Sequence, residues 1–277
     1  MTGVLLFAQN NPDVAAGFST REIVFIEAIL FLSGIMSGLS GFGFSAVGAA
    51  TLLLIEPITE APLLQTLSMG NQLLSLEQLR ADMPKSWKRF WDGPGYPILG
   101  GLPGAYCGVW MLGHLPARQL MTVFGSFLVL YCVYSLFKPA HVKLRGFDGP
   151  VAATIVGFIG AAFGGFTAFP GSAVVVWTGL RGLPKQQNRA IVQPYIIVCQ
   201  LWSLGLIALQ RPEYFSHRYF TLLFLTLPAV LPGTFAGVQM YRRISDIGFR
   251  RICFFLLGLS GAALLARLYG PTLVHLL

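Results

Sequence analysis

The chain has 277 residues, of which 55% are apolar and only 11% are charged. Ordinary soluble domains carry about 25% charged residues, so 19 basic and 11 acidic side chains cannot cover a soluble protein of this size. With a mean hydropathy of +0.67, the composition excludes a soluble enzyme, a disordered tail and a fibrous protein. It predicts an all-α polytopic membrane protein.

Residues 1–20 form an N-terminal tail with no basic region before its short apolar run, so we expect no cleaved signal peptide. The apolar blocks that follow approach or exceed the ~20 residues that a helix needs to cross the hydrocarbon core. The longest polar gap between them, residues 80–95, is too short for a soluble domain, and we expect no nucleotide-binding module. The eight blocks are residues 22–55, 61–79, 96–115, 117–137, 149–180, 190–210, 218–241 and 249–269.

An internal repeat divides the chain into two units of four blocks each. PGAYCGVWM at residues 103–111 recurs as PGTFAGVQM at 232–240, and GFSA at 43–46 recurs as GFTA at 165–168. A repeated pattern of this kind marks a repeated structural unit. We predict a first transmembrane repeat over residues 21–137, a cytoplasmic linker over 138–146 and a second transmembrane repeat over 147–277.

The first block of each repeat is too long for one straight crossing and contains a glycine-rich break. Each block is therefore either one kinked crossing or a re-entrant hairpin that enters and leaves on the same side. With single crossings the 19 basic residues divide 11 to 8 between the two sides, whereas hairpins divide them 14 to 5. The positive-inside rule favours hairpins, and three full crossings per unit then make the two repeats inverted. The cytoplasmic loops in this topology hold Lys85, Lys143, Lys185 and Arg250, with both termini outside.

The two glycine-rich breaks are the first candidate binding elements, because helix N-termini present free N–H groups and a positive dipole end to an anion. Irregular backbone at membrane depth is tolerated only inside protein or beside a wet cavity. The alternative is close helix packing, since Gly34 with Gly38 and Gly160 with Gly164 form GxxxG pairs. The candidate substrate-binding residues here are Gly41, Gly43, Phe44 and Ser45 in the first break, and Gly164, Gly165, Phe166 and Thr167 in the second.

Polar side chains in the second block of each repeat are the other candidates, because polar groups at membrane depth are costly unless paired. Hydrogen bonding between helices is an equally good explanation, and Arg189 is also interpretable as a helix-end cation that faces the cytoplasm. Glu27 is either a carrier of a coupling proton or a solvated residue near the interface. The candidates in this group are Gln65, Asn71, Asn188, Arg189 and Gln193.

The other motifs indicate helix packing or argue against catalysis, nucleotide binding and metal binding. The PGxxxG pairs at 103–108 and 232–237 predict close helix contacts. GLSG at 38–41 matches the GxSG of rhomboid-type proteases, but the four histidines fall at block ends or in loops, so no base stands near Ser40. No GK[ST] follows a glycine string, and no cysteine lies near a histidine. We expect no catalytic residue, no metal, no cofactor and no nucleic-acid partner.

The broken first segments, their recurrence midway and the PGxxxG third segments together resemble the sulfite exporter TauE/SafE family of membrane transporters. The resemblance covers nearly the whole chain. It implies a multi-pass transporter of the cell (inner) membrane that exports or imports sulfur-containing anions such as sulfite or organosulfonates, without ATP hydrolysis on the same chain. Its expected partners are a small anionic substrate, the lipid bilayer and a coupling ion, either a proton or sodium. An anion channel is the competing interpretation, and an intramembrane enzyme is a third.

Overall fold

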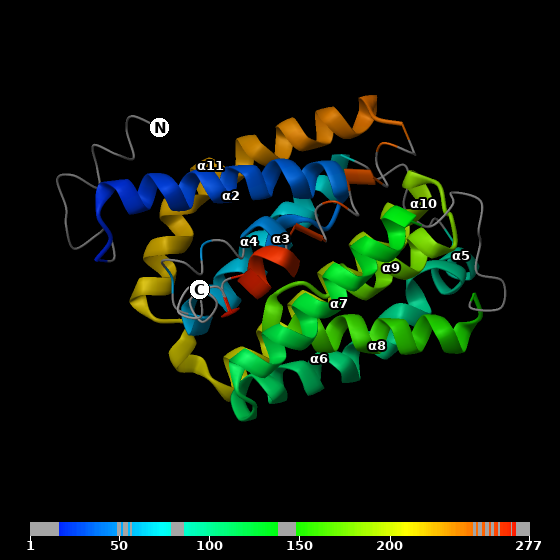
Figure 1. Cartoon of the computed structure of the whole chain (residues 1–277), viewed down its shortest axis with the longest axis horizontal. Coiled ribbons are helices and arrows are strands. Elements are labelled where there is room, and N and C mark those ends of the chain that lie inside the picture. The colour runs from blue at the N-terminus through cyan, green and yellow to red at the C-terminus, as the bar shows by residue number, and fades with distance from the viewer. Residues whose placement is uncertain are drawn as a thin grey trace.

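The computed structural model describes residues 17–48, 51, 55, 57–78, 86–137 and 148–245, with separate positions between 248 and 269. In these ranges every regular element is a helix, and the helices form one elongated bundle (Figure 1). The elements are α2 (Thr20–Ser40), α3 (Phe44–Gly48), α4 (Pro57–Gln78), α5 (Trp87–Phe90), the π-helix η3 (Trp91–Gly95), α6 (Tyr96–His114), α7 (Ala117–Phe137), α8 (Pro150–Thr167), α9 (Gly171–Leu180), α10 (Lys185–Gln210), the 3-10 helix η4 (Pro212–Tyr214) and α11 (His217–Arg243). Residues 1–16 of the predicted N-terminal tail and the whole predicted linker, residues 138–146, lie outside the described residues.

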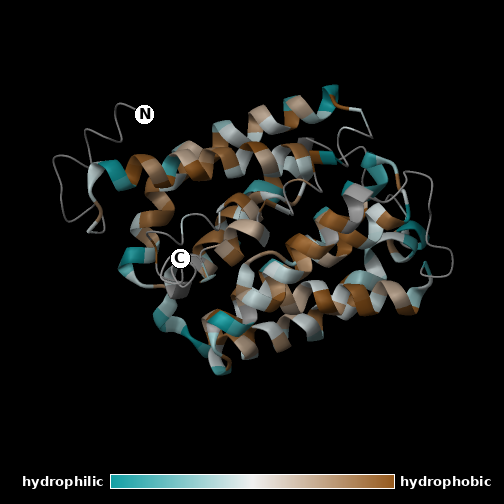
Figure 2. Ribbon diagram, viewed as in Figure 1, coloured by the Kyte–Doolittle hydropathy of each residue, from teal (hydrophilic) through white to brown (hydrophobic). Residues whose placement is uncertain are grey.

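In the part of the chain that the structure describes, four helices, α2, α8, α10 and α11, are long and apolar enough to cross a membrane by length and composition. Figure 2 shows the same pattern, with apolar residues along the middle of the bundle and hydrophilic residues concentrated toward its ends. Large apolar side chains such as Val123, Leu130 and Phe224 are more than 60% exposed on the outer surface. An apolar exterior of this kind requires lipid around it. The predicted all-α polytopic membrane fold is therefore confirmed.

The bundle has two ends, which we name after a described cation at each. At the Lys185 end, α10 begins and α11 ends, and Lys185 Nζ donates a hydrogen bond to the Tyr241 carbonyl at 3.2 Å. At the Arg218 end, α2 and α11 begin, and the Arg218 guanidinium lies 4.9 Å from the ring centroid of Phe18. These contacts fix the directions of α2, α10 and α11 in the bundle.

α2 and α11 run parallel and touch along their glycine faces. A Cβ added at Gly34 would lie 2.7 Å from the Val230 carbonyl oxygen, and one added at Gly38 would lie 2.9 Å from the Val238 amide nitrogen. Gly233 and Gly237 face α2 in the same way. The two backbones approach this closely only because glycine lacks a side chain.

α6 and α8 form a second parallel pair with the same kind of contact. A Cβ at Gly104 would meet the backbone of Phe158, and one at Gly165 would lie 2.6 Å from the Val109 amide nitrogen. The packing role predicted for both PGxxxG motifs is thus confirmed. Each PGxxxG helix packs against the broken segment from the other half of the chain, so the two halves interlock.

Each broken segment starts and finishes at one end of the bundle. α2 begins at the Arg218 end, and so does α4. The Thr66 hydroxyl in the first half of α4 forms a hydrogen bond of 2.8 Å with the hydroxyl of Tyr219, near the start of α11. α8 begins at the Lys185 end beside the start of α6, and α9 leads back to the start of α10 at the same end. Both segments therefore have the geometry of hairpins.

The second break lies three to four residues later than the sequence predicted. Gly164, Gly165, Phe166 and Thr167 are all inside the continuous helix α8, and the break occupies Ala168–Pro170. Pro170 is the cause, because proline has no amide hydrogen to donate and disfavours helical geometry in the residue before it. The GFSA and GFTA motifs are therefore not at equivalent structural positions.

The two breaks have similar local geometry, and their equivalent residues are 127 positions apart in the sequence. α2 ends at Ser40 with Gly41 left-handed at φ 82°, and α8 ends at Thr167 with Ala168 left-handed at φ 59°. The Ser40 hydroxyl accepts from the Gly43 amide at 3.0 Å, and the Thr167 hydroxyl accepts from the Phe169 amide at 3.2 Å. A hydroxyl at each helix end thus satisfies backbone donors where the helix stops.

Gly104→Ala tests the helix contact. The new Cβ meets the backbone of α8, so we expect a loss of about 1–3 kcal/mol and a lower melting temperature. Gly205→Ala is the matched control, because Gly205 lies inside α10 with nothing within 4 Å of its added Cβ. That control is expected to be neutral or to stabilise by about 0.5–1 kcal/mol. Equal melting temperatures for the two variants would contradict the packing.

Candidate functional site

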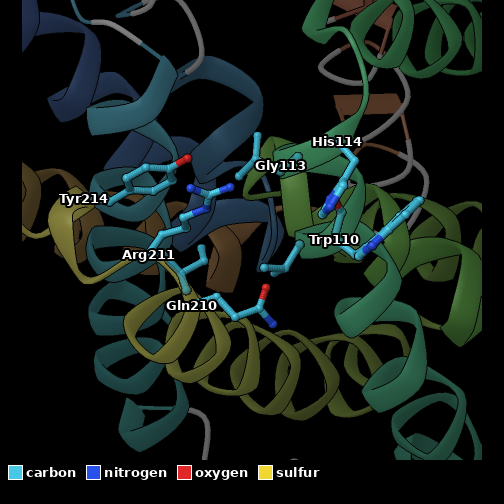
Figure 3. Close-up of a pocket in the computed structure, with 9 residues that line it drawn as sticks. Trp110, Gly113, His114, Gln210, Arg211 and Tyr214 are labelled. Carbon is cyan, nitrogen blue, oxygen red and sulfur yellow. The ribbon is translucent and has the colours of Figure 1, made fainter.

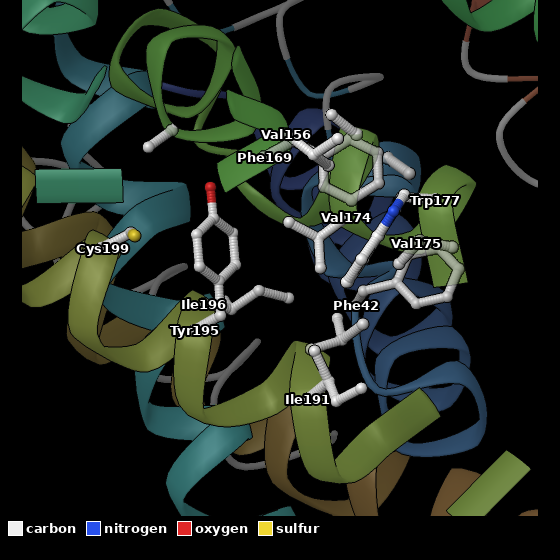
Figure 4. Close-up of a cluster of buried hydrophobic side chains, with 14 of the residues drawn as sticks. Phe42, Val156, Phe169, Val174, Val175, Trp177, Ile191, Tyr195, Ile196 and Cys199 are labelled. Carbon is white, nitrogen blue, oxygen red and sulfur yellow. The ribbon is translucent and has the colours of Figure 1, made fainter. Parts of the chain in front are cut away.

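The two breaks meet in the interior of the bundle. Phe42 and Phe169 stack with ring centroids 6.0 Å apart and planes 9° from parallel. Ser45 Oγ donates to the Ala168 carbonyl at 2.6 Å. Figure 4 shows Phe42 and Phe169 with the apolar residues of α9 and α10 that surround them, including Val174. This cluster closes one side of the meeting point with packed apolar side chains.

On another side the breaks meet a row of buried polar side chains, which we call the polar seam. It consists of Gln65, Ser68, Gln72 and Ser75 on α4 and Arg189, Gln193, Gln200 and Ser203 on α10, all at most 3% exposed. Their spacing of three, four or seven residues places each set on one face of its helix. The seam therefore runs between α4 and α10 along the interior of the bundle.

Glutamines of the seam hold the backbone of both breaks. Gln72 Nε2 donates to the Gly41 carbonyl at 2.8 Å. Gln200 Nε2 donates to the Ala168 carbonyl at 3.2 Å and to Ser68 Oγ at 3.0 Å. Each left-handed residue thus receives an amide hydrogen bond from a glutamine, one on α4 and one on α10.

The two helices are joined across the seam itself. Gln193 Nε2 on α10 donates to Gln72 Oε1 on α4 at 3.1 Å. Gly41, Gln72 and Gln193 therefore form one continuous hydrogen-bonded chain from the first break to α10. Five of the predicted site residues lie at the meeting point of the breaks or in the seam: Gly41, Ser45, Gln65, Arg189 and Gln193.

Several polar atoms of the seam have no hydrogen-bond partner among the described residues. These atoms include Nε2 and Oε1 of Gln65, which is 0% exposed, Oε1 of Gln193 and Oε1 of Gln200. A buried polar group without a partner costs about 1–3 kcal/mol. Native proteins rarely retain such groups without a functional reason, so the seam has free capacity for a polar ligand.

Arg189 brings a positive charge to the seam at its Lys185 end. The side chain is 1% exposed, Nη1 donates to the Gly38 carbonyl at 3.0 Å, and the guanidinium lies 4.3 Å from the Tyr241 ring centroid. Lys185 lies one turn earlier and also contacts the Tyr241 ring, at 4.9 Å. The interpretation of Arg189 as a solvated helix-end cation is therefore wrong, because the residue is buried between α2, α10 and α11.

The helix-end donors predicted to attract an anion are partly occupied in this structure. Two amides of the first break, those of Phe42 and Gly43, donate to the Ser40 hydroxyl. The Phe169 amide donates to Thr167 in the second break. Gln65 Nε2, an amide donor of the seam that has no partner among the described residues, is thus a better candidate donor to an anion than these backbone groups.

The remaining predicted site residues occupy other surroundings. Gly164 lies against Pro170, and Gly165 lies against the backbone of α6. Phe166 packs in the aromatic cluster around Phe124. Phe44 is buried in the apolar cluster of α2 and α4, and the Gly43 carbonyl accepts a hydrogen bond from the Val47 amide in α3. The two asparagines are bonded to threonines of other helices. Asn71 Oδ1 accepts from Thr234 Oγ1, and Asn188 Nδ2 donates to Thr178 Oγ1 at 2.9 Å.

Five seam residues were not among the predicted site residues: Ser68, Gln72, Ser75, Gln200 and Ser203. Gln200 is the clearest omission, since it stands seven residues after Gln193 in an otherwise apolar helix. Polar residues at helical spacing inside a membrane-length apolar segment mark one face, and this signal was available in the sequence. Glu27 is also buried, at 4% exposed, so it is not the solvated interfacial residue that was considered as an alternative.

A bundle of apolar helices in which two breaks meet beside a buried polar seam is the architecture of an integral membrane protein, and broken helices that meet inside the membrane recur in secondary transporters. The family model for the sulfite exporter TauE/SafE matches residues 26–264. The match covers nearly the whole chain, and the chain belongs to this family. A search of curated proteins and a search of solved structures each found no match.

Gln65→Met tests whether the seam is a ligand site. The substitution removes a buried amide that lacks partners among the described residues, so we expect the ligand-free protein to gain stability or stay unchanged. Binding of sulfite should weaken. Gln200→Met is the contrasting variant, because its amide is bonded to Ser68 and Ala168, and its loss should lower the melting temperature. A marked loss of stability in Gln65→Met would show that this amide is structural.

Proposed function

We propose that the protein is a secondary transporter that carries a small sulfur-containing anion across the membrane through the polar seam. The family is one of membrane transporters for sulfite and related sulfur anions, and the seam is the observation that carries the proposal. In hydrocarbon, uncompensated buried amides are costly. A polar ligand that enters the seam gives these groups their partners.

The anion is held by neutral amide and hydroxyl groups together with one cation. Gln65 Nε2 and the hydroxyl of Ser172 are fully buried donors without a partner among the described residues. Gln193 Nε2 donates one hydrogen to Gln72 and has a second hydrogen to donate. Arg189 supplies the positive charge, since a guanidinium matches oxyanion geometry. Sulfite and the sulfonate head group both present oxygen acceptors to such donors.

Alternating access is the proposed mechanism, with the two halves arranged as inverted repeats. Three features support it: each broken segment has hairpin geometry, the two hairpins start from opposite ends, and their breaks meet in the middle. Broken helices at the interface of inverted repeats are a recurrent design of secondary transporters. No nucleotide chemistry is required, and the buried Glu27 is the candidate carboxyl for proton coupling.

The alternatives fit the geometry less well. An anion channel needs a continuous polar path, but Ile207, one turn after Ser203 on the same face of α10, is buried in an apolar cluster with Val109 and Leu206. An intramembrane enzyme built on Ser40 needs a base, and the Ser40 hydroxyl instead bonds to the Met36 carbonyl at 2.7 Å and caps the first break. Transport therefore accounts best for the seam.

Gln193→Ala tests the proposal in proteoliposomes that contain the purified full chain. Loss of one hydrogen bond to a charged ligand costs about 1.5–3 kcal/mol, or roughly 10- to 150-fold in affinity. We expect sulfite affinity to fall by that factor and transport at low sulfite to fall with it. Pro232→Ala in the packing motif should instead lower the melting temperature and keep the affinity. A Gln193→Ala protein with unchanged sulfite binding would rule out the seam as the site.

The proposed topology places the Lys185 end in the cytoplasm. Described cations support it, since they gather at that end: Lys88, Arg89, Arg181, Lys185, Arg242 and Arg243, against Arg21, Arg118, Arg211 and Arg218 at the other. The predicted markers Lys85, Lys143 and Arg250 lie outside the described residues. The inner membrane of the cell is the proposed location.

Cysteine labelling in intact cells tests this topology. Gly149→Cys and Gln186→Cys stand on either side of the α8–α9 hairpin, at exposed positions. In a background without the native cysteines, both should resist a membrane-impermeant reagent, whereas Glu213→Cys at the Arg218 end should react. Labelling of Gly149→Cys and Gln186→Cys from opposite sides would mean that the segment crosses the membrane.

A further inference from the structure

A pocket at the Arg218 end lies outside the polar seam and has a different chemistry. It is formed where α6 ends and where α10 gives way to η4 (Figure 3). Its lining residues are Val109, Trp110, Leu112, Gly113, His114, Ile207, Gln210, Arg211 and Tyr214. None of these residues belongs to the seam or to the breaks.

The pocket has an apolar floor. Val109 is 5% exposed and Ile207 is 1% exposed, and both belong to one apolar cluster with Leu206, against which Tyr214 packs. Trp110 and His114 stack on one side with ring centroids 4.6 Å apart. A ligand with an apolar portion can therefore bury it against these side chains.

The rim of the pocket is cationic and polar. Figure 3 shows the Arg211 side chain extending toward Gly113 beside Tyr214, with Gln210 close by. A Cβ at Gly113 would lie 3.6 Å from Arg211 Nη2, so the absence of a side chain there leaves space next to the guanidinium. The ion pair of Arg211 with Glu213 is long, at 3.7 Å, and exposed. Such pairs contribute little, so an incoming anion can displace the carboxylate.

The pocket is aligned with the seam along α10. Seam residues Gln193, Gln200 and Ser203 are followed on the same face by Ile207, one turn after Ser203. Ile207 lines the pocket and belongs to one apolar cluster with Val109 and Leu206. A ligand in the pocket would therefore contact the face of α10 that carries the seam, one turn beyond Ser203.

We propose that this pocket is an anion-capture site for a short organic sulfonate, held by Arg211 at its acidic head and by the apolar floor at its carbon chain. The proposal deepens the transport function above and rests on it for the role of the site. Arginine binds an oxyanion with two parallel hydrogen bonds, and the floor gives an alkyl sulfonate a contact that inorganic sulfite lacks. The pocket therefore favours ethanesulfonate over sulfite.

The test is calorimetric titration of the purified full chain with ethanesulfonate. Arg211→Gln should weaken its binding about tenfold or more. Gly113→Val, which fills the space beside the guanidinium, should do the same. Arg118→Gln is the matched control, because Arg118 is a cation at the same end that lies over Tyr269, 5.1 Å from its ring centroid, and does not line the pocket. Equal affinities in Arg211→Gln and Arg118→Gln would overturn the proposal.

Two further experiments distinguish binding at the pocket from binding at the seam, and a soluble anion from a lipid headgroup. Gln193→Ala should lose sulfite binding and keep the Arg211-dependent binding of ethanesulfonate, so failure of the seam and failure of the pocket give different results. The titration is repeated in nanodiscs of phosphatidylcholine with and without phosphatidylglycerol. Unchanged ethanesulfonate affinity supports a site for a soluble anion, and competition by phosphatidylglycerol assigns the pocket to a lipid headgroup and overturns the proposal.

Discussion

Inside a membrane every backbone polar group needs a partner from the protein, and this constraint shapes the centre of the molecule. A helix that stops halfway exposes carbonyl and amide groups that no water can reach. Here a hydroxyl at the last helical residue accepts from the freed amides, and Gln72 and Gln200 donate to the carbonyls of Gly41 and Ala168. The breaks and the polar seam are therefore mutually dependent: neither is stable in hydrocarbon without the other.

This dependence explains why glutamines serve both structure and function in one place. The Nε2 group of Gln72 or Gln200 is committed to a break, while the Nε2 donor of Gln65, elsewhere in the seam, has no partner among the described residues. A ligand that binds the free groups also touches side chains that hold the break. Binding is thereby coupled to the geometry of both broken segments, which is what a transporter that changes shape around its substrate needs.

Composition and periodicity were sufficient to predict the helical membrane fold, the position of the first break and the close contacts of the PGxxxG motifs. The second break was placed too early because its glycines resemble the first motif, whereas Pro170 decides where the helix ends. The burial of Arg189 could not be predicted from the sequence either, because a cation near the start of a helix is ordinarily solvated. Only the fold shows that α2 and α11 end against that side chain. Gln200 had a periodic signal that sequence reasoning did not use.

The interlocked packing of the halves has a consequence for synthesis of the protein. The glycine face of α2 touches α11, and the contacting residues Gly38 and Val238 are roughly 200 positions apart along the chain. When the first half leaves the ribosome and enters the membrane, α2 and α6 lack their partners, and the surfaces made for close backbone contact face lipid or transient neighbours. Final packing has to wait until α11 is inserted. The arrangement also means that the halves, expressed as two separate polypeptides in one cell, have a large complementary surface through which to find each other.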